Sequence, residues 1–250
     1  MRSIYSISIL IALVALMALR LPVQASKLDN RIESSAKQSY VFKTYLKNDD
    51  IKVQARDGAV TLTGTVSEES HKSLAQETVM GLPGVKGVDN QLEVKGETAD
   101  KNSDAWLITK VKSTLLFHRS VSATTKVDAK DGVVTLRGEA ASQAQKDLTT
   151  EYAKDVDGVK DVKNEMTVTK SAKKSQTVGG KIDDASITAQ VKMALLYHRS
   201  TSALNTSVTT KKGIVTLSGK AATVAELDLA TKLANDVNGV KGVNNLMVVK

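Results

Sequence analysis

Apolar and polar positions follow one pattern three times along the chain. Each copy opens with a helical pattern in which apolar residues recur four apart, most clearly Leu107, Val111, Leu115 and Ile187, Val191, Leu195. A short strand is expected next, around Val53, Val127 or Val208. The pattern then predicts a second strand, a second helix and a last strand, in the order α-β-β-α-β.

The second strand coincides with a repeated phrase, Gly-x-Val-Thr-Leu-x-Gly. It occupies residues 58–64, 132–138 and 213–219. Each phrase is followed, 26 residues after its first glycine, by a Gly-Val pair: Gly84-Val85, Gly158-Val159 and Gly239-Val240. An ungapped match of this length indicates that one small module is present three times.

Local signals mark the ends of the elements within each module. An Asp-Gly or Lys-Gly pair at the start of each phrase predicts a β-hairpin turn. The glycine that closes the phrase is expected at a bulge or a close backbone approach. Ser142-x-x-Gln145 and Thr223-x-x-Glu226 have the form of a capping box and predict where the second helix begins, whereas the first copy lacks a clean box. The Gly of each Gly-Val pair ends that helix.

These elements predict an α+β fold made of three tandem αββαβ modules. The second helix is a right-handed crossover, so the last strand should lie parallel to the Val-Thr-Leu strand. Each module is then a mixed three-stranded sheet with two helices on one face. The modules are expected at residues 27–95, 104–170 and 184–250, joined by polar linkers at 96–103 and 171–183. Such linkers predict three separate beads.

The first 25 residues have the pattern of an export signal. Arg2 is followed by an uncharged, mostly apolar run from Ile7 to Leu19 and by Val23-Gln24-Ala25, which predicts cleavage after Ala25. The run is shorter than the roughly 20 residues that span a bilayer, although an uncleaved anchor is the alternative. The sequence contains no cysteine, which excludes a lipid-modified cysteine and disulfides. The expected location is the periplasm, with secretion as the other possibility.

The positive charge of the chain is unevenly distributed. Residues 26–100 hold 10 basic and 12 acidic side chains, residues 101–180 hold 14 and 10, and residues 181–250 hold 9 and 5. A basic exported protein meets anionic partners such as phospholipid headgroups, phosphorylated glycolipids and acidic glycans. Nucleic acid is a poor candidate, because export removes the opportunity and aromatic residues make up only 3% of the chain.

The repeated phrase, the later Gly-Val pair and the terminal hydrophobic strand resemble the BON domain over residues 27–250. A signal peptide followed by tandem BON domains is similar to the plan of osmotically inducible periplasmic proteins, with three copies here where two are common. The resemblance implies a module without enzymatic activity that is associated with the cell envelope. It also implies binding to phospholipid surfaces.

A candidate lipid-binding surface lies on the first helix of the second module. Trp106, Lys110 and Phe117 fall nearly opposite its apolar stripe, with Lys112 nearby. A Trp and a Phe flanked by lysines suit a helix at a membrane interface. Asp104-Ala105-Trp106 also resembles the start of lipid-contacting helices in the family. The alternative is that Trp106 covers the edge of its own module or packs against a neighbouring module or subunit.

A second candidate site is a tripeptide that the second and third modules share. It reads His118, Arg119, Ser120 in one and His198, Arg199, Ser200 in the other, and the first module lacks it. His and Arg at a helix end stabilise the negative end of the helix dipole, which is the structural explanation. The functional alternative is a duplicated anion site. No metal site is expected, because no histidine has an i,i+4 partner or a carboxylate cluster.

The sequence argues against an enzyme and predicts no cofactor. It contains no Gly-x-Ser-x-Gly and no cysteine nucleophile. The stretch from Gly213 to Lys220 superficially suggests a phosphate loop, but its spacing is one residue too long and Ala221 replaces the required Ser or Thr. The leading hypothesis is therefore an envelope protein that binds anionic phospholipid membranes peripherally. The alternative is a periplasmic protein–protein scaffold or chaperone-like factor that uses the same surfaces.

Overall fold

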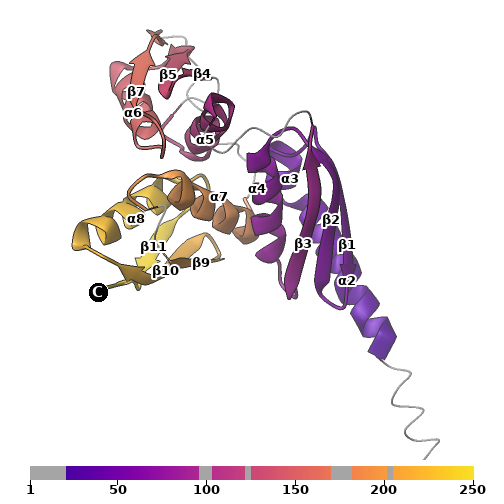
Figure 1. Cartoon of the computed structure of the whole chain (residues 1–250). Coiled ribbons are helices and arrows are strands. Elements are labelled where there is room, and N and C mark those ends of the chain that lie inside the picture. The colour runs from indigo at the N-terminus through magenta and orange to yellow at the C-terminus, as the bar shows by residue number, and fades with distance from the viewer. Residues whose placement is uncertain (1–20, 96–102, 122–124, 170–181, 202–204) are drawn as a thin grey trace, which may run out of the picture.

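The computed structural model describes residues 21–95, 103–121, 125–169, 182–201 and 205–250, with side chains from residue 27 onward. These residues form three small modules (Figure 1). The expected signal sequence up to residue 20 and most of both expected linkers lie outside the described residues. Ser103 and Asp183, expected in the linkers, are helix caps that accept hydrogen bonds from the backbone N–H groups of Trp106 (3.2 Å) and Ser186 (2.9 Å).

The three modules share one order of helix, hairpin, second helix and last strand, with an extra helix in the first module and short extra strands in the other two. The first has α2 (Leu21–Gln38), α3 (Tyr40–Thr44), β1 (Asp50–Arg56), β2 (Ala59–Val66), α4 (Glu69–Met80) and β3 (Gly87–Val94). The second has α5 (Asp104–Phe117), β4 (Lys126–Lys130), β5 (Val133–Arg137), β6 (Glu139–Ala140), α6 (Gln143–Lys154), β7 (Asp161–Asn164) and β8 (Thr167–Val168). The third has α7 (Asp184–Tyr197), β9 (Thr206–Lys211), β10 (Ile214–Ala221), α8 (Val224–Asp236), β11 (Gly242–Asn245) and β12 (Val248–Val249).

The sheet of each module is mixed, which confirms the predicted α+β fold. The hairpin pairs β1–β2, β4–β5 and β9–β10 are antiparallel, and the crossover strands β3, β7 and β11 are parallel to their partners. Asp57 (φ 53°) and Gly58 (φ 84°) both have positive φ, as a type I′ hairpin turn requires. A Cβ on Gly64 would lie 2.0 Å from the carbonyl oxygen of Asp50, so the expected close backbone approach is confirmed.

The capping boxes of the second helices are confirmed with one change. Ser142 accepts a hydrogen bond from the N–H of Gln145 (3.1 Å), and the Gln145 side chain in turn accepts one from Ala141, the residue before the cap (2.7 Å). Thr223 and Glu226 repeat this arrangement in the third module. The first module has no side-chain cap at this position, as its sequence indicated.

The three modules pack on one another, so the expectation of separate beads is wrong. Helix α7 of the third module lies against α4 of the first and α5 of the second (Figure 1). Ala189, Met193 and Tyr197 of α7, together with Phe117 of α5, complete the hydrophobic core of the first module. The physical reason is that apolar residues of α7 lie on more than the side that faces its own sheet: 11 of its 14 residues are buried, and Asp184, Lys192 and Leu196 are the ones that are not.

Polar contacts fix the position of α7 against the first module. Ser186 Oγ accepts a hydrogen bond from the backbone N–H of Val41 (3.1 Å). The fully buried Gln190 accepts one from the Tyr45 hydroxyl (3.2 Å). At the edge of this contact, Lys192 Nζ lies 2.6 Å from Glu77 Oε2.

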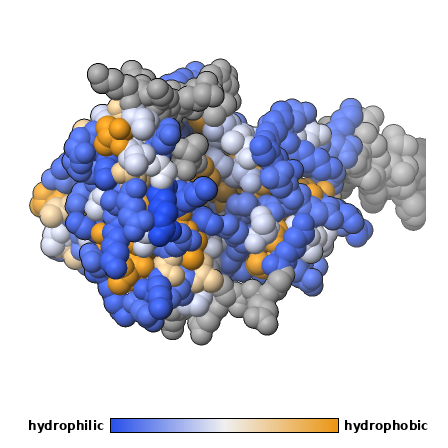
Figure 2. Space-filling model, turned by 90° about the horizontal axis from the view of Figure 1, so that it is seen from above, coloured by the Kyte–Doolittle hydropathy of each residue, from blue (hydrophilic) through white to orange (hydrophobic). Residues whose placement is uncertain are grey.

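The outer surface is mostly hydrophilic, with small separate hydrophobic areas on the face seen in Figure 2. Within the described ranges, no helix has the length and apolar character needed to cross a membrane.

Replacing Met193 with Ala should lower the free energy of unfolding by about 2–5 kcal/mol, because the side chain is fully buried where α7 meets the first module. Leu196 on the same helix is 52% exposed and provides the matched control. We expect Leu196→Ala to cost about 0.5 kcal/mol or less. Urea unfolding followed by circular dichroism measures both, and equal costs would contradict the packing described above.

Candidate functional site

The expected membrane-facing stripe of α5 does not face solvent, which corrects that prediction. Phe117 is only 1% exposed, and its ring meets Tyr45 of the first module edge-on at a centroid distance of 5.6 Å. Lys110 is 8% exposed. The side of α5 opposite its own core is covered by α7 and the first module. Lys112 is exposed, and Trp106 is half-buried with its ring edge-on to Tyr197 at 6.4 Å.

The hollow beside Trp106 does not form an anion site. Its volume is about 410 Å³, and both lysines that line it already have partners. Lys110 Nζ donates to the backbone oxygen of Asp157 and lies 3.3 Å from its carboxylate, while Lys160 Nζ donates to the backbone oxygen of Asp131 (3.0 Å). These lysines therefore hold the module together at this edge.

Asp104 has a structural role that the sequence analysis missed. Its carboxylate accepts hydrogen bonds from the backbone N–H groups of Asp131 (2.7 Å) and Gly132 (2.9 Å) in the hairpin turn. These two bonds hold the pKa of Asp104 below its usual value, and the bond from Gly132 has the larger effect. Asp29 and Asp184 bind the turns of the other modules in the same way. An aspartate 28 or 29 residues before the turn glycine in all three modules was the available signal.

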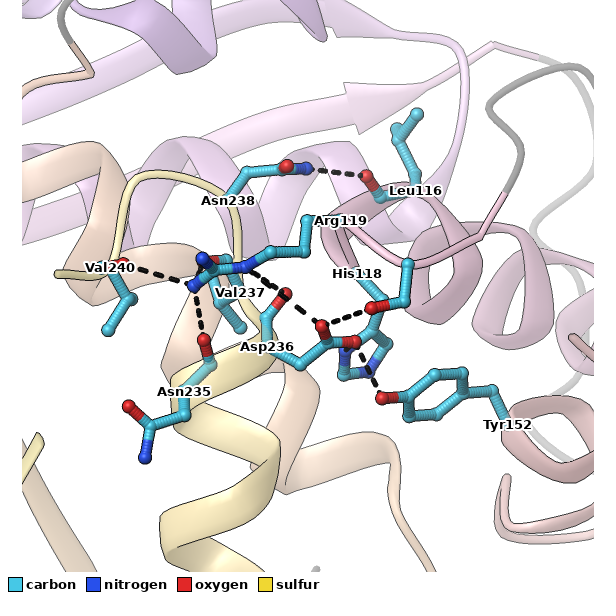
Figure 3. A network of polar contacts seen from close by, with 10 residues as sticks. Leu116, His118, Arg119, Tyr152, Asn235, Asp236, Val237, Asn238 and Val240 are labelled. Carbon is cyan, nitrogen blue, oxygen red and sulfur yellow. Dashed lines mark hydrogen bonds and ion pairs between the residues drawn. The ribbon is translucent and has the colours of Figure 1, made fainter. Parts of the chain in front are cut away.

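The His-Arg-Ser tripeptide of the second module lies at the junction with the third module (Figure 3). The Arg119 guanidinium donates to backbone oxygens at the end of α8, those of Asn235, Val237 (3.1 Å) and Val240 (3.0 Å). The backbone N–H of Arg119 donates to the carbonyl of Asp236 (3.0 Å). Carbonyls at a helix C-terminus lack partners within the helix and carry the negative end of its dipole. Arg119 therefore caps a helix of the neighbouring module.

Asp236 is the centre of this network. The hydroxyls of Ser120 and Tyr152 donate to its two carboxylate oxygens, each at 2.6 Å, and His118 Nδ1 lies 3.2 Å from Oδ2. Burial alone raises the pKa of Asp236, but the contacts with His118, Ser120 and Tyr152 outweigh burial and hold the pKa below its usual value. Burial and the neighbouring carboxylate raise the pKa of Tyr152, so the phenol stays a donor. The His118 ring stacks on Tyr152 at 4.0 Å.

The third module returns the same contacts to the second. The backbone N–H of Arg199 donates to the carbonyl of Asp155 (2.8 Å), and its guanidinium donates to the carbonyls of Lys154 and Val159 at the end of α6. His198 Nε2 lies 3.5 Å from the Asp155 carboxylate. Antiparallel bridges pair His118 with Val237 and His198 with Val156. The junction is therefore approximately two-fold symmetric, with each module both donor and acceptor.

The first module has no such junction because its sequence differs at the same point. Gly81-Leu82-Pro83 stands where the other modules have Asp155-Val156-Asp157 and Asp236-Val237-Asn238. A Cβ on Gly81 would lie 3.3 Å from Cα of Ala185 in α7. The glycine thus allows α7 to approach α4 closely, and helix packing replaces the capping contacts.

These contacts decide between the two explanations of the tripeptide. His118 and Arg119 do meet the C-terminal end of a helix, but it belongs to the other module rather than to their own. The contacts argue against the alternative, an anion site at His118, Arg119 and Ser120, because helix carbonyls and Asp236 of this same chain accept from Arg119 and Ser120. No group of three or more His, Asp or Glu side chains within the described residues is arranged to hold a metal ion.

The comparison with protein families matches all three modules. The model described as "BON domain" fits residues 28–96, 103–170 and 183–250. The chain belongs to the BON domain family.

Relatives of this BON protein include envelope proteins. Osmotically-inducible protein Y of Escherichia coli K12 is 35% identical over 143 residues, which are 55% of this chain and 71% of that protein. Outer membrane lipoprotein DolP of Haemophilus influenzae is 34% identical over 125 residues, 46% of this chain and 64% of the lipoprotein. The structure of CdsD, a structural protein of the type III secretion system of Chlamydia trachomatis, matches 90% of this chain and 92% of its own at 16% identity, but the TM-score of 0.25 supports no conclusion.

Tyr152→Phe should destabilise the protein by about 1–3 kcal/mol, because it removes one donor to the partly buried carboxylate of Asp236 and keeps the ring that stacks on His118. In an Asp236→Ala background the same substitution should cost about 0.5 kcal/mol or less. Denaturant unfolding of the four proteins of this cycle gives the coupling. Equal costs in both backgrounds would show that the hydrogen bond does not contribute.

Acidification should weaken the junction between the second and third modules. Burial lowers the pKa of His198, and the nearby Asp155 opposes this without cancelling it. A lowered histidine pKa gives stability that is complete above the usual value of about 6.5 and is lost as the pH falls below it. We expect the urea concentration at the unfolding midpoint to decrease as the pH is lowered from about 7.5 to about 5.5, and to decrease less in His198→Gln. An identical pH dependence in both proteins would exclude this role of His198.

Proposed function

We propose that this chain is an exported, non-enzymatic protein of the cell envelope that binds anionic phospholipid surfaces peripherally, in protection against envelope or osmotic stress. Its similarity to osmotically-inducible protein Y and to outer membrane lipoprotein DolP supports the envelope and stress part of this proposal. We propose that the signal peptide is cleaved after Ala25 and that the mature protein is located in the periplasm.

The distribution of charge is the observation that carries the lipid part of the proposal. Residues 101–180 have an excess of four basic side chains and residues 181–250 have the same excess, whereas residues 26–100 have an excess of two acidic ones. Within the described modules the excess lies on the third, because residues 182–250 hold eight basic and five acidic side chains whereas residues 103–169 hold ten of each, so the third module is the basic body. An anionic leaflet attracts such a body by about 1 kcal/mol for each basic residue close to the surface.

The burial of Phe117 and Lys110 limits what the second module offers to a membrane. Of the residues expected to touch lipid, Lys112 is exposed and Trp106 is exposed in part. Of the predicted residues, only these two are therefore not buried, and the ring of Trp106 already lies against Tyr197. A protein–protein scaffold or chaperone-like factor is the rival function, and ionic strength separates the two.

The protein should co-sediment with phosphatidylglycerol-containing vesicles and not with phosphatidylcholine vesicles. Because lysines at the surface are screened by salt, binding should weaken steeply between about 0.05 and 0.3 M NaCl. Vesicle co-sedimentation of the exported protein measures this, and mass spectrometry of the same sample locates its N-terminus. Failure to bind anionic vesicles at low salt would favour the scaffold function.

A further inference from the structure

The outer faces of the three sheets can be compared position by position. Met166 and Met247 are buried after a break in the last strand, and Leu92 is buried at the same position of the first module. An asparagine lies two residues before each of them, at Asn90, Asn164 or Asn245, and its side chain donates to a carbonyl of the second helix. This shared contact fixes the alignment, and the residues on either side of each buried one point away from the helices.

The outer face of the third module is apolar where the other two are polar. Leu246 and Val248 flank Met247 and are 65% and 57% exposed. The equivalent residues are Glu165 and Thr167 in the second module and Gln91 and Glu93 in the first. An exposed apolar pair beside lysines on an open sheet face is a candidate surface for contact with a partner.

This face also differs from the others in charge. Strands β9 to β12 contain no acidic residue, whereas the strands of the first and second modules each contain three. The five acidic side chains of residues 181–250 all lie on α7, α8 or their caps: Asp183, Asp184, Glu226, Asp228 and Asp236. Exposed lysines stand at both ends of the sheet, Lys211 at the hairpin and Lys220 and Lys250 at the far end, where Glu226 lines the same hollow as the two lysines.

The face is directed away from the rest of the protein. Among the described elements, the main contacts of β9 to β12 outside their own sheet are with α7 and α8, which cover the opposite face. In Figure 1, β9, β10 and β11 lie on the side of the third module that is remote from the second module. The second module therefore does not cover this face.

We propose that the outer sheet face of the third module, formed around Leu246, Val248, Lys211, Lys220 and Lys250, is the surface that docks on an anionic phospholipid bilayer. The inference rests on the proposed function and names the part of the chain that performs it. An anionic bilayer offers phosphates to the lysines and an apolar layer to Leu246 and Val248. A second copy of the same face fits less well, because antiparallel or parallel stacking brings lysines against lysines.

The test replaces Leu246 by Glu and Val248 by Thr, the residues that the second module carries at these positions. The matched control is Thr167→Glu, which changes the net charge equally and places in the second module the residue type of Glu93. We expect the double variant to bind phosphatidylglycerol-containing vesicles at least about tenfold more weakly, and the control to bind within about twofold of the unmodified protein. Thermal unfolding verifies that each variant is folded.

A second readout uses the single tryptophan of the chain. Brominated anionic lipid should quench the fluorescence of a Leu246→Trp, Trp106→Phe variant more strongly than it quenches Trp106 in the unmodified protein. This quenching experiment does not use the double variant and therefore does not depend on its stability. The added indole ring occupies the exposed position of Leu246.

The outcomes separate the two proposals. If the unmodified protein does not bind anionic vesicles, the proposed function fails and this inference fails with it. If the unmodified protein binds and the double variant binds like the Thr167→Glu control, the inference is overturned and the proposed function stands. If the double variant loses self-association in sedimentation velocity and keeps vesicle binding, the face is an interface between copies instead.

Discussion

The burial of most of helix α7 is the constraint on which the arrangement of the three modules depends. Eleven of its 14 residues are buried, which is more than the side facing its own sheet can account for. Its own sheet covers only one side, so α4 of the first module and α5 of the second have to cover the others. The same requirement explains why Phe117 of α5 and Tyr197 of α7 belong to the core of the first module. Three repeats thereby become one body.

The second and third modules are held by an exchange of helix ends in addition to the packing of α5 on α7. Each supplies a His-Arg-Ser tripeptide after its first helix and an Asp at the end of its second helix. One local sequence therefore provides both halves of a two-fold contact, and repetition of the module produces the interface without any new element. The first module has Gly81 in place of that Asp, and this glycine selects helix packing as its mode of contact.

The sequence predicted the features that depend on near neighbours and missed those that depend on the other modules. The hairpin turns, parallel crossovers and capping boxes follow from residues a few positions apart, and the structure confirms them. The helical pattern of α5 showed which side faces its own core, but it contains no information on what covers the opposite side. For that reason the pattern places Phe117 in solvent, whereas Lys110 is buried through its contact with Asp157 of its own module. The role of Asp104 was within reach, because Asp29, Asp104 and Asp184 keep nearly constant distances from their turns.

This division also changes how differences between the repeats are interpreted. A basic residue that two modules share, such as Arg119 or Arg199, is used to join the modules and is no longer available to a partner. Positive charge available for binding has to come from residues outside the junction. Leu246 and Val248 differ in character from the equivalent residues of the other two modules. Those modules form the same sheet with polar residues there, so packing of the sheet does not require apolar side chains at these positions. Their apolar character in the third module therefore calls for a cause outside the fold, and contact with another surface supplies one.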